Sequence, residues 1–444
     1  MHGILASSVG VTCAAALTLP LALSAPAQAR PQAARTEPVA PGSTQSLPLV
    51  PLSGDRSLGP AAPEQGLGRR SVRTFSLVGV VWDDPDTELR GRVQVRTRAT
   101  GANRWSGWQD IETHNHEHAA DPDTAESGSG RVRGSTAPLW VGDSDGVEVR
   151  VQAQVDERAT AAGESPLPRG MHLELVDPGA EPAPRGALPG DGSAGAESAE
   201  TYATFATNAE LAPFGATEIP ALSRAETERE APALRDGAPL VKPYIGARPR
   251  IVTRRGWGAD ESLRERAFVY TKKVKAAFVH HTASGNNYRC SQAPSVIRSI
   301  YRYHVVSSGW RDIGYNFLVD KCGNIYEGRA GGVAKPVMGA HTLGFNSDSM
   351  GIAVLGSYGK TKPAAAAVTA IARLTAWKLG LSGADPRGKT YLKSGGGNLY
   401  RKGKNVRLNV ISGHRDGFAT ECPGKLLYGK LGSARTAAAR YQGR

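Results

Sequence analysis

Two histidines and a cysteine in the C-terminal part of the chain have the types and spacing of a zinc site. His414 and Cys422 are separated by seven residues, in a segment expected to form a loop between a strand and a helix. Upstream, an apolar run that reads as a buried strand ends in His280 and His281. Two His and one Cys can bind Zn²⁺ and leave the fourth tetrahedral position to water. This pattern indicates a catalytic zinc site rather than a closed structural one.

The two adjacent histidines are not expected to act together. Successive side chains of a strand point to opposite faces of the sheet, so His280 and His281 cannot both reach one metal ion. One would be a ligand and the other a packed or hydrogen-bonded histidine. The pattern alone does not decide which is which.

The elements that must position these residues form an α/β domain over residues 247–444. Strand and helix signals alternate, which predicts a mixed sheet flanked by helices. A basic, glycine-rich excursion is expected over residues 383–404. The expected strands are 276–281, 314–319, 324–327, 349–355 and 406–412, and the expected helices are 291–306, 363–380 and 423–441.

The front of the chain differs in composition. Short runs with period two and Gly/Asp/Pro turns predict an all-β, sandwich-like domain over residues 71–178, with strands at 75–82, 92–96, 147–152 and 171–176. Residues 30–70 and 179–246 are rich in Pro, Ala, Gly and Ser, and we expect a disordered leader and a disordered linker there. Trp105, Trp108 and Trp140 are interpreted as core or edge aromatics, with a sugar-binding face as the alternative.

One short cluster in the β-rich part resembles a metal-binding motif. His114, His116 and His118 alternate with Asn115 and Glu117. The cluster lies among Ala, Asp and Pro in an apparent loop, so we interpret it as a solvated loop and not as a metal site.

The charge of the 444-residue chain is unevenly divided. Residues 248–444 hold 33 of the 54 Lys and Arg and 10 of the 41 Asp and Glu, a net charge of +23, whereas the remainder carries −10. A cationic domain suits an anionic polymer, either nucleic acid or the anionic polymers of a cell wall. No zinc-finger, RNP or basic-zipper pattern supports nucleic acid.

The N-terminus predicts export. Residues 4–23 are largely apolar and Ala27-Gln28-Ala29 is a small-x-small cleavage site, so residues 1–29 read as a signal peptide and the protein as secreted. Because the cationic domain suits anionic wall polymers, we also expect the protein to be associated with the cell wall. No other apolar run is long enough to span a membrane. Removing Cys13 with the signal leaves three cysteines, which we interpret as a Cys290–Cys322 disulfide plus Cys422 as a zinc thiolate; a free buried Cys422 is the alternative.

A series of ordered blocks runs through the C-terminal domain, and together they carry a family resemblance. The blocks are Arg255-Gly256-Trp257-Gly258-Ala259, His280-His281-Thr282-Ala283, Gly309-Trp310-Arg311-Asp312-Ile313-Gly314-Tyr315-Asn316-Phe317, Tyr326-Glu327-Gly328-Arg329, Gly339-Ala340-His341-Thr342, Phe345-Asn346, Ser349-Met350-Gly351-Ile352, Gly413-His414-Arg415-Asp416 and Cys422-Pro423-Gly424. With these blocks in this order, residues 248–441 resemble the peptidoglycan recognition protein family, the type 2 N-acetylmuramoyl-L-alanine amidases.

The resemblance implies roles for individual residues. His280, the first of the pair, would bind zinc together with His414 and Cys422. Tyr315 would lie beside the zinc and donate to the developing oxyanion. Thr420, which matches a position that holds Thr or Lys in active members, would be the second catalytic residue that stabilises this oxyanion.

Three further residues are the expected substrate contacts. They are His341, Asn316 and Trp257, with a core position as the alternative for Trp257. The general base stays open, because Glu421 is interpreted as a surface residue and Asp416 as a turn residue.

The expected activity is a secreted zinc amidase. It would hydrolyse the bond between the lactyl group of N-acetylmuramic acid and L-alanine in peptidoglycan, with zinc-bound water as nucleophile, and it would act as a monomer. One alternative is a non-catalytic peptidoglycan-binding recognition protein, although the complete His280, His414 and Cys422 set favours an enzyme. Another is a cysteine hydrolase with Cys422 as nucleophile and His414 as base.

Overall fold

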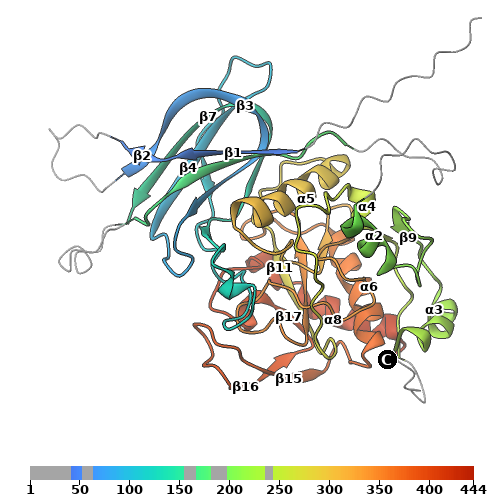
Figure 1. Ribbon diagram of the computed structural model, residues 1–444. Helices are drawn as coiled ribbons and strands as arrows, with labels where there is room; N and C mark the ends of the chain where they lie inside the picture. The colour runs from blue at the N-terminus through green and yellow to red at the C-terminus, as the bar shows by residue number, and fades with distance from the viewer. Residues whose placement is uncertain (1–41, 53–63, 155–166, 182–197, 236–243) are drawn as a thin grey trace, which may run out of the picture. The chain divides into compact units, whose positions relative to one another are not determined.

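The C-terminal domain is built on a seven-stranded mixed sheet. The computed structural model describes residues 42–52, 64–154, 167–181, 198–235 and 244–444 (Figure 1). The sheet order is β17-β11-β14-β12-β13-β10-β9. Its strands are β9 (Glu218–Ile219), β10 (Ile251–Val252), β11 (Ala276–His281), β12 (Phe317–Val319), β13 (Ile325–Glu327), β14 (Ser349–Val354) and β17 (Ile411–Gly413).

Parallel pairing at the centre of this sheet decides where the site lies. β11 is parallel to both β14 and β17, and β12 is parallel to β14, whereas β12 and β13 form an antiparallel hairpin. The carboxyl ends of β11 and β17 therefore meet at one edge of the sheet. The expected mixed sheet is confirmed, and β11, β13 and β14 lie close to their predicted bounds. The single strand expected over residues 406–412 is instead divided, with residues 405–409 in a separate hairpin and residues 411–413 in this sheet, and β12 is shorter than expected.

Helices cover both faces of the sheet. On one face α6 (Ala365–Leu381) and α8 (Leu431–Gln442) pack over a core that includes Val279 and Ile352. On the other face lies α5 (Ala293–Arg302), which begins with Pro294 in its first turn and continues into a π-helical turn, Tyr303–Ser307. Short helices complete the domain: α4 (Arg254–Trp257) and α7 (Lys425–Tyr428). The basic excursion forms a separate hairpin of β15 (Lys389–Lys393) and β16 (Asn405–Asn409).

The β-rich part is one sheet of eight strands. The order is β1-β8-β3-β7-β4-β5, with β2 and β6 also paired to β3. Register shifts in the β3–β7 pairing bend these long strands, and the sheet curls around an apolar core (Figure 1). The bounds are β1 (Ser43–Pro48), β2 (Val50–Pro51), β3 (Glu64–Trp82), β4 (Gly91–Ala99), β5 (Gln109–Ile111), β6 (Gly134–Ser135), β7 (Leu139–Ala153) and β8 (His172–Asp177).

Two stretches that sequence composition assigned to disorder contain regular structure. In the leader, β1 pairs along its whole length with β8, which covers an edge that would otherwise be open. In the linker, α2 (Ala199–Ala206) and α3 (Arg224–Glu230) form, each with a serine N-cap. The prediction of disorder is therefore wrong for these elements.

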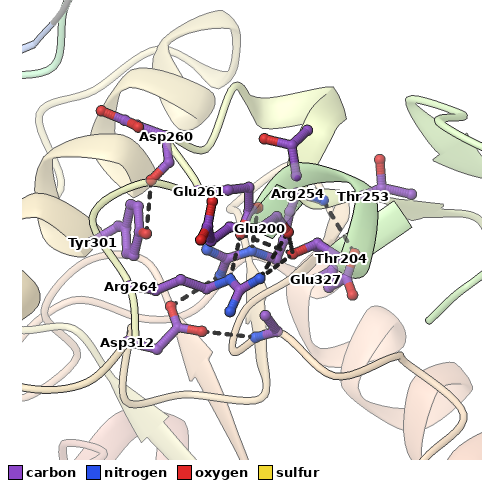
Figure 2. Close-up of polar contacts among 12 residues, drawn as sticks. Glu200, Thr204, Thr253, Arg254, Asp260, Glu261, Arg264, Tyr301, Asp312 and Glu327 are labelled. Carbon is purple, nitrogen blue, oxygen red and sulfur yellow. Dashed lines mark hydrogen bonds and ion pairs between the residues drawn. The ribbon is translucent and has the colours of Figure 1, made fainter. Parts of the chain in front are cut away.

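Buried polar contacts explain why the α2 stretch is ordered in spite of its few large apolar residues. Thr204 Oγ1 donates to Glu261 at 3.0 Å and Asn208 Nδ2 donates to Glu327 at 2.8 Å. Figure 2 shows the surrounding network, in which Glu261 receives hydrogen bonds from Arg254 at 2.7 Å and Arg264 at 2.6 Å. The carboxylates of Glu261 and Glu327 are buried and need hydrogen-bond donors. Thr204 and Asn208 supply two of these donors, and these bonds hold α2 and the residues after it in place.

The β-rich sheet and the C-terminal domain pack against each other. Residues 39–444 form one compact unit. Leu77, Trp140 and Val176 of the β-rich sheet share a buried cluster with α5, and the Tyr303 hydroxyl donates to Thr136 O at 3.1 Å. Within the described residues, no helix is both long enough and apolar enough to cross a membrane. The predicted signal peptide lies outside those residues.

Candidate metal centre and active site

Two parallel strands bring the two histidines together. Val279 of β11 pairs with Gly413 of β17. His280 comes directly after Val279, and His414 comes directly after Gly413. The ring centroids of the two histidines lie 4.6 Å apart. Both side chains are fully buried.

Strand alternation sends the neighbouring histidine elsewhere. His281 Nδ1 accepts a hydrogen bond from the Tyr358 N–H at 3.3 Å, and burial lowers the pKa of His281 to about 4. The member of the pair that lies beside His414 is thus His280.

A short loop returns Cys422 to the same point. The Arg415 N–H donates to Cys422 O at 3.1 Å, and the Cys422 N–H donates to Thr420 Oγ1 at 3.1 Å. Cys422 is buried and is not in a disulfide. Its Sγ lies 3.8 Å from His280 Nδ1.

A fourth donor comes from the β-rich part of the chain. We call residues 112–133, which connect β5 to β6, the inserted segment. It carries His118, which is 5% exposed and whose Nε2 lies 3.6 Å from Cys422 Sγ. The interpretation of the cluster around His118 as a solvated loop is therefore wrong, because this residue is buried against the two histidines and Cys422.

These four residues fit a metal ion. One donor atom from each of His118, His280, His414 and Cys422 lies within 4.8 Å of all the others. A tetrahedral zinc with Zn–S near 2.3 Å and Zn–N near 2.0–2.1 Å puts sulfur and nitrogen roughly 3.5 Å apart, close to the two measured separations. Among the described residues, neither ring nitrogen of His414 has a hydrogen-bond partner although both are buried. A cation would satisfy this otherwise unpaired imidazole.

The electrostatics of the set agree with that assignment. Burial raises the pKa of the Cys422 thiol well above its usual value and lowers the pKa of His280 and His414 well below theirs. Without a cation the site would hold a neutral thiol and neutral imidazoles. A divalent ion stabilises the thiolate and binds the imidazoles in the neutral form that they already have.

The two candidate oxyanion donors lie beside this set. The Tyr315 ring is buried, with its centroid 5.5 Å from that of His280 and 5.9 Å from that of His118. Thr420 Oγ1 donates to Glu117 Oε1 at 2.7 Å. The hydroxyl of Thr420 thus points toward a carboxylate supplied by the inserted segment.

The three expected substrate contacts prove to be interior residues. Trp257 is fully buried and its Nε1 donates to Glu327 O at 2.7 Å. His341 is also fully buried, with Nδ1 3.0 Å from Thr342 Oγ1. Asn316 uses its amide within the fold, because Nδ2 donates to Val337 O and Oδ1 accepts from the Gly351 N–H, both at 2.8 Å. All three side chains are buried and make these hydrogen bonds within the fold; their contact with substrate stays a prediction.

Other expectations hold. The structure contains the Cys290–Cys322 disulfide. Glu421 is an exposed surface residue, and Asp416 accepts from the Gly413 N–H at 2.9 Å, as a turn residue does.

Comparison with known protein families divides the chain in the same way. Residues 26–170 match the family described as Rv3811 N-terminal galactose-binding domain-like. Residues 270–425 match the N-acetylmuramoyl-L-alanine amidase family.

Individual relatives agree with the second match. Peptidoglycan-recognition protein SC2 of Drosophila simulans is 34% identical over 183 residues, which are 41% of this chain and 84% of that protein. A human N-acetylmuramoyl-L-alanine amidase is 32% identical over 193 residues, 42% of this chain and 28% of that protein. The solved structure of Drosophila PGRP-LB matches at 26% identity and a TM-score of 0.33, over 41% of this chain and 92% of that one.

Proposed function

The chain belongs to the peptidoglycan recognition protein and N-acetylmuramoyl-L-alanine amidase family, and we propose that it is a zinc-dependent amidase of peptidoglycan. The bond cleaved is the amide between the lactyl group of N-acetylmuramic acid and L-alanine. The observation that carries this proposal is the convergence of His280, His414 and Cys422 at the carboxyl ends of two parallel strands. The human relative named N-acetylmuramoyl-L-alanine amidase supports the reaction class.

The metal would be held by residues that the fold already orients. His280 Nδ1 faces Cys422, and His280 Nε2 lies 3.4 Å from Thr342 Oγ1, so Thr342 acts as a positioning residue that fixes the ring. A Zn²⁺ ion bound here would polarise the scissile carbonyl and lower the pKa of an attacking water molecule toward about 7.

Two hydroxyl groups would stabilise the reaction's negative charge. Burial holds the pKa of Tyr315 well above its usual value, so the phenol stays protonated and can donate to the carbonyl oxygen as it becomes anionic. Thr420 is the second donor, and its present acceptor is the carboxylate of Glu117. Preorganised donors of this kind are worth roughly 3 kcal/mol each in the transition state.

The site of action that we propose is the cell wall. Residues 1–29 would direct export, and the excess positive charge of residues 248–444 would favour anionic wall polymers over a neutral surface. Peptidoglycan is the proposed substrate and partner, and the active form would be a monomer.

A non-catalytic recognition protein is the second candidate function. The observation that favours it is the presence of the inserted segment over His280, His414 and Cys422, with His118 and Glu117 of that segment in contact with Cys422 and Thr420. Such a protein would bind peptidoglycan without cleaving it.

Digestion of purified peptidoglycan separates the two functions. The mature protein is incubated with and without chelator, and new amino termini and reducing sugars are then quantified. New L-alanine amino termini without new reducing ends, abolished by chelator and restored by zinc, would establish the amidase. Binding without new termini, by zinc-loaded wild type and by zinc-loaded His118→Ala alike, would establish the recognition role.

A further inference from the structure

The inserted segment gives the metal centre a donor that the proposed reaction does not need. A catalytic zinc keeps one coordination position open, whereas a site with four protein donors is closed. His118 Nε2 lies 3.6 Å from Cys422 Sγ, and the ring of His118 lies edge-on to His414 at a centroid distance of 4.5 Å. His118 therefore stands where the fourth ligand of a tetrahedral ion would be.

Glu117, the residue before His118, is hydrogen-bonded to Thr420, the second proposed oxyanion donor. The Glu117 carboxylate accepts the hydrogen bond of Thr420 at 2.7 Å, which is the bond that a substrate oxyanion would accept. Glu117 is 2% exposed, and its backbone carbonyl accepts from the Leu343 N–H at 3.0 Å. The imidazole of His118 thus lies at the proposed metal position, and the carboxylate of Glu117 binds the hydroxyl of Thr420. Both are groups that would act on the scissile bond.

An aspartate anchors the segment to the loop that orients His280. Asp121 Oδ1 accepts from the Gly344 N–H at 2.8 Å and from Asn346 Nδ2 at 2.7 Å. Asn346 Oδ1 in turn accepts from the N–H of Thr342 at 3.1 Å. Asp121 of the inserted segment is thus joined through Asn346 to Thr342, the residue that positions the His280 ring.

A buried ion pair forms a second anchor. Glu126 and Arg329 make a two-pronged contact, with distances of 2.8 and 2.9 Å, and both side chains are nearly inaccessible to solvent. The Arg311 N–H also donates to Glu126, at 3.3 Å. Such charge-assisted pairs are directional and fix the segment in one position.

Little space remains for a substrate. The cavity between the segment and the site has a volume of about 20 Å³ and is lined by Glu117, His118, Thr420 and Cys422, among others. That volume holds about one water molecule. A glycan carrying a stem peptide cannot reach the donor set unless the segment leaves.

We propose that His118 is the fourth zinc ligand of this protein and that the inserted segment keeps the amidase latent. Ligation by His118 stands on the donor geometry alone, whereas its inhibitory consequence rests on the proposed function. Activation would be a ligand exchange: His118 would leave the metal as a neutral imidazole and withdraw with the segment, and a water molecule would take its place. No proton or electron has to be supplied from elsewhere.

Cobalt substitution tests the ligation directly. Full-length wild type, His118→Ala and His114→Ala are each loaded with Co²⁺, and their visible spectra are recorded before and after addition of azide. His114 is exposed and outside the donor set, so His114→Ala is the matched control. We expect azide to change the spectrum of His118→Ala and to leave those of wild type and the control unchanged. A wild-type spectrum that responds to azide as strongly as the variant's would overturn the proposal.

Metal affinity provides an independent readout. Competition with a chelator should show His118→Ala losing at least about tenfold in zinc affinity, within the range found when metal-site residues are lost, while His114→Ala is unchanged. Equal affinities in all three proteins would contradict ligation by His118. Should His118→Ala fold poorly, His118→Gln fills a similar volume without an imidazole and takes its place.

An activity comparison separates the two proposals. Peptidoglycan digestion by zinc-loaded His118→Ala should be at least about tenfold faster than by wild type or His114→Ala. Equal rates would contradict latency and leave the amidase function standing. If the cobalt and affinity measurements succeed and no variant releases L-alanine termini, the amidase function fails and His118 remains a ligand.

Discussion

Single side chains decide whether this centre can do chemistry. Tyr315 and Thr420 flank the donor set, but they are held differently. Tyr315 is fixed by packing against the rings of His280 and His118, whereas the hydroxyl of Thr420 bonds to both Glu117 and the backbone of Cys422. Tyr315 is therefore the cleaner residue for a test, because its hydroxyl can be removed without disturbing a ligand's backbone.

Tyr315→Phe should lower kcat by roughly 100-fold, since one oxyanion donor is worth about 3 kcal/mol. The substitution is made in the His118→Ala background, where the site is open. Zinc content measured in parallel should stay at that of the parent. A kcat within about twofold of the parent, at full zinc content, would remove Tyr315 from the proposed mechanism.

Metal removal should destabilise the whole protein, because four buried donors would lose their common partner. With free zinc 1,000-fold above its dissociation constant, the ion contributes about 4 kcal/mol to the free energy of unfolding. Thermal unfolding with and without chelator measures this loss. It should be larger for wild type than for His118→Ala, and an identical melting temperature with and without chelator would argue that no ion is bound.

At the scale of secondary structure, the sequence predicts most of the C-terminal domain. Clear apolar patterns predict β11, β14 and α6 within one or two residues. The alternation of strands and helices predicts a mixed sheet, but the parallel pairing of β11 with β17, which places His280 beside His414, comes from the structure. Composition failed for β1 and α2 because their order depends on partners distant in sequence, β8 in one case and Glu261 in the other. The local sequence pattern does not show contacts with residues that are distant in the sequence.

The family resemblance names His280, His414 and Cys422, and the structure brings these three side chains together; their role as zinc ligands stays a prediction. Composition does not reveal that His118 is buried beside them, because these partners lie about 160 to 300 residues away in the sequence. The alternating histidines of residues 114–118 were the available signal. Trp257, His341 and Asn316 belong to motifs near the site, and sequence proximity does not distinguish a supporting residue from one that touches substrate.

Helix α6 carries a buried lysine that should make stability depend on pH. Lys378 Nζ donates to Val333 O and Lys335 O, both at 2.7 Å, and burial lowers the pKa of Lys378 to about 7 from its usual 10.5. Between these values the folded protein binds fewer protons than the unfolded chain, so the stability contributed by this residue rises with pH and is lost as pH falls toward 7.

Lys378→Met isolates that contribution, since all other titrating groups are common to both proteins. Between pH 6.5 and 9.5 the wild type should gain about 3 kcal/mol in free energy of unfolding relative to the variant. Denaturant unfolding at the two pH values measures the difference. A constant difference would show that Lys378 keeps an ordinary pKa in the folded protein.

At the scale of the whole molecule, the β-rich sheet does more than precede the C-terminal domain. Its Leu77, Trp140 and Val176 complete the core on the α5 face, and its inserted segment covers the metal centre. The apolar contacts join the β-rich sheet to α5, whereas Asp121 and Glu126 join the inserted segment to Gly344 and Arg329. Weakening an anchor should therefore loosen the segment while the sheet stays packed on α5.

Glu126→Gln tests that separation. The substitution keeps the shape but removes the charge that pairs with buried Arg329, and breaking a buried pair costs roughly 3–5 kcal/mol. We expect faster proteolytic cleavage within residues 112–133 and higher amidase activity than wild type. Glu112→Gln, at an exposed position of the same segment, is the control and should leave both unchanged; equal cleavage rates in Glu126→Gln and wild type would contradict the anchoring role.

The most direct test of a latent zinc amidase is the rate at which His118→Ala and wild type release L-alanine amino termini from peptidoglycan at equal, measured zinc content. We expect at least about tenfold faster release by the variant, no new reducing sugars, and loss of activity in both proteins with chelator. Zinc-loaded His118→Ala that binds peptidoglycan and releases no L-alanine termini would contradict that expectation.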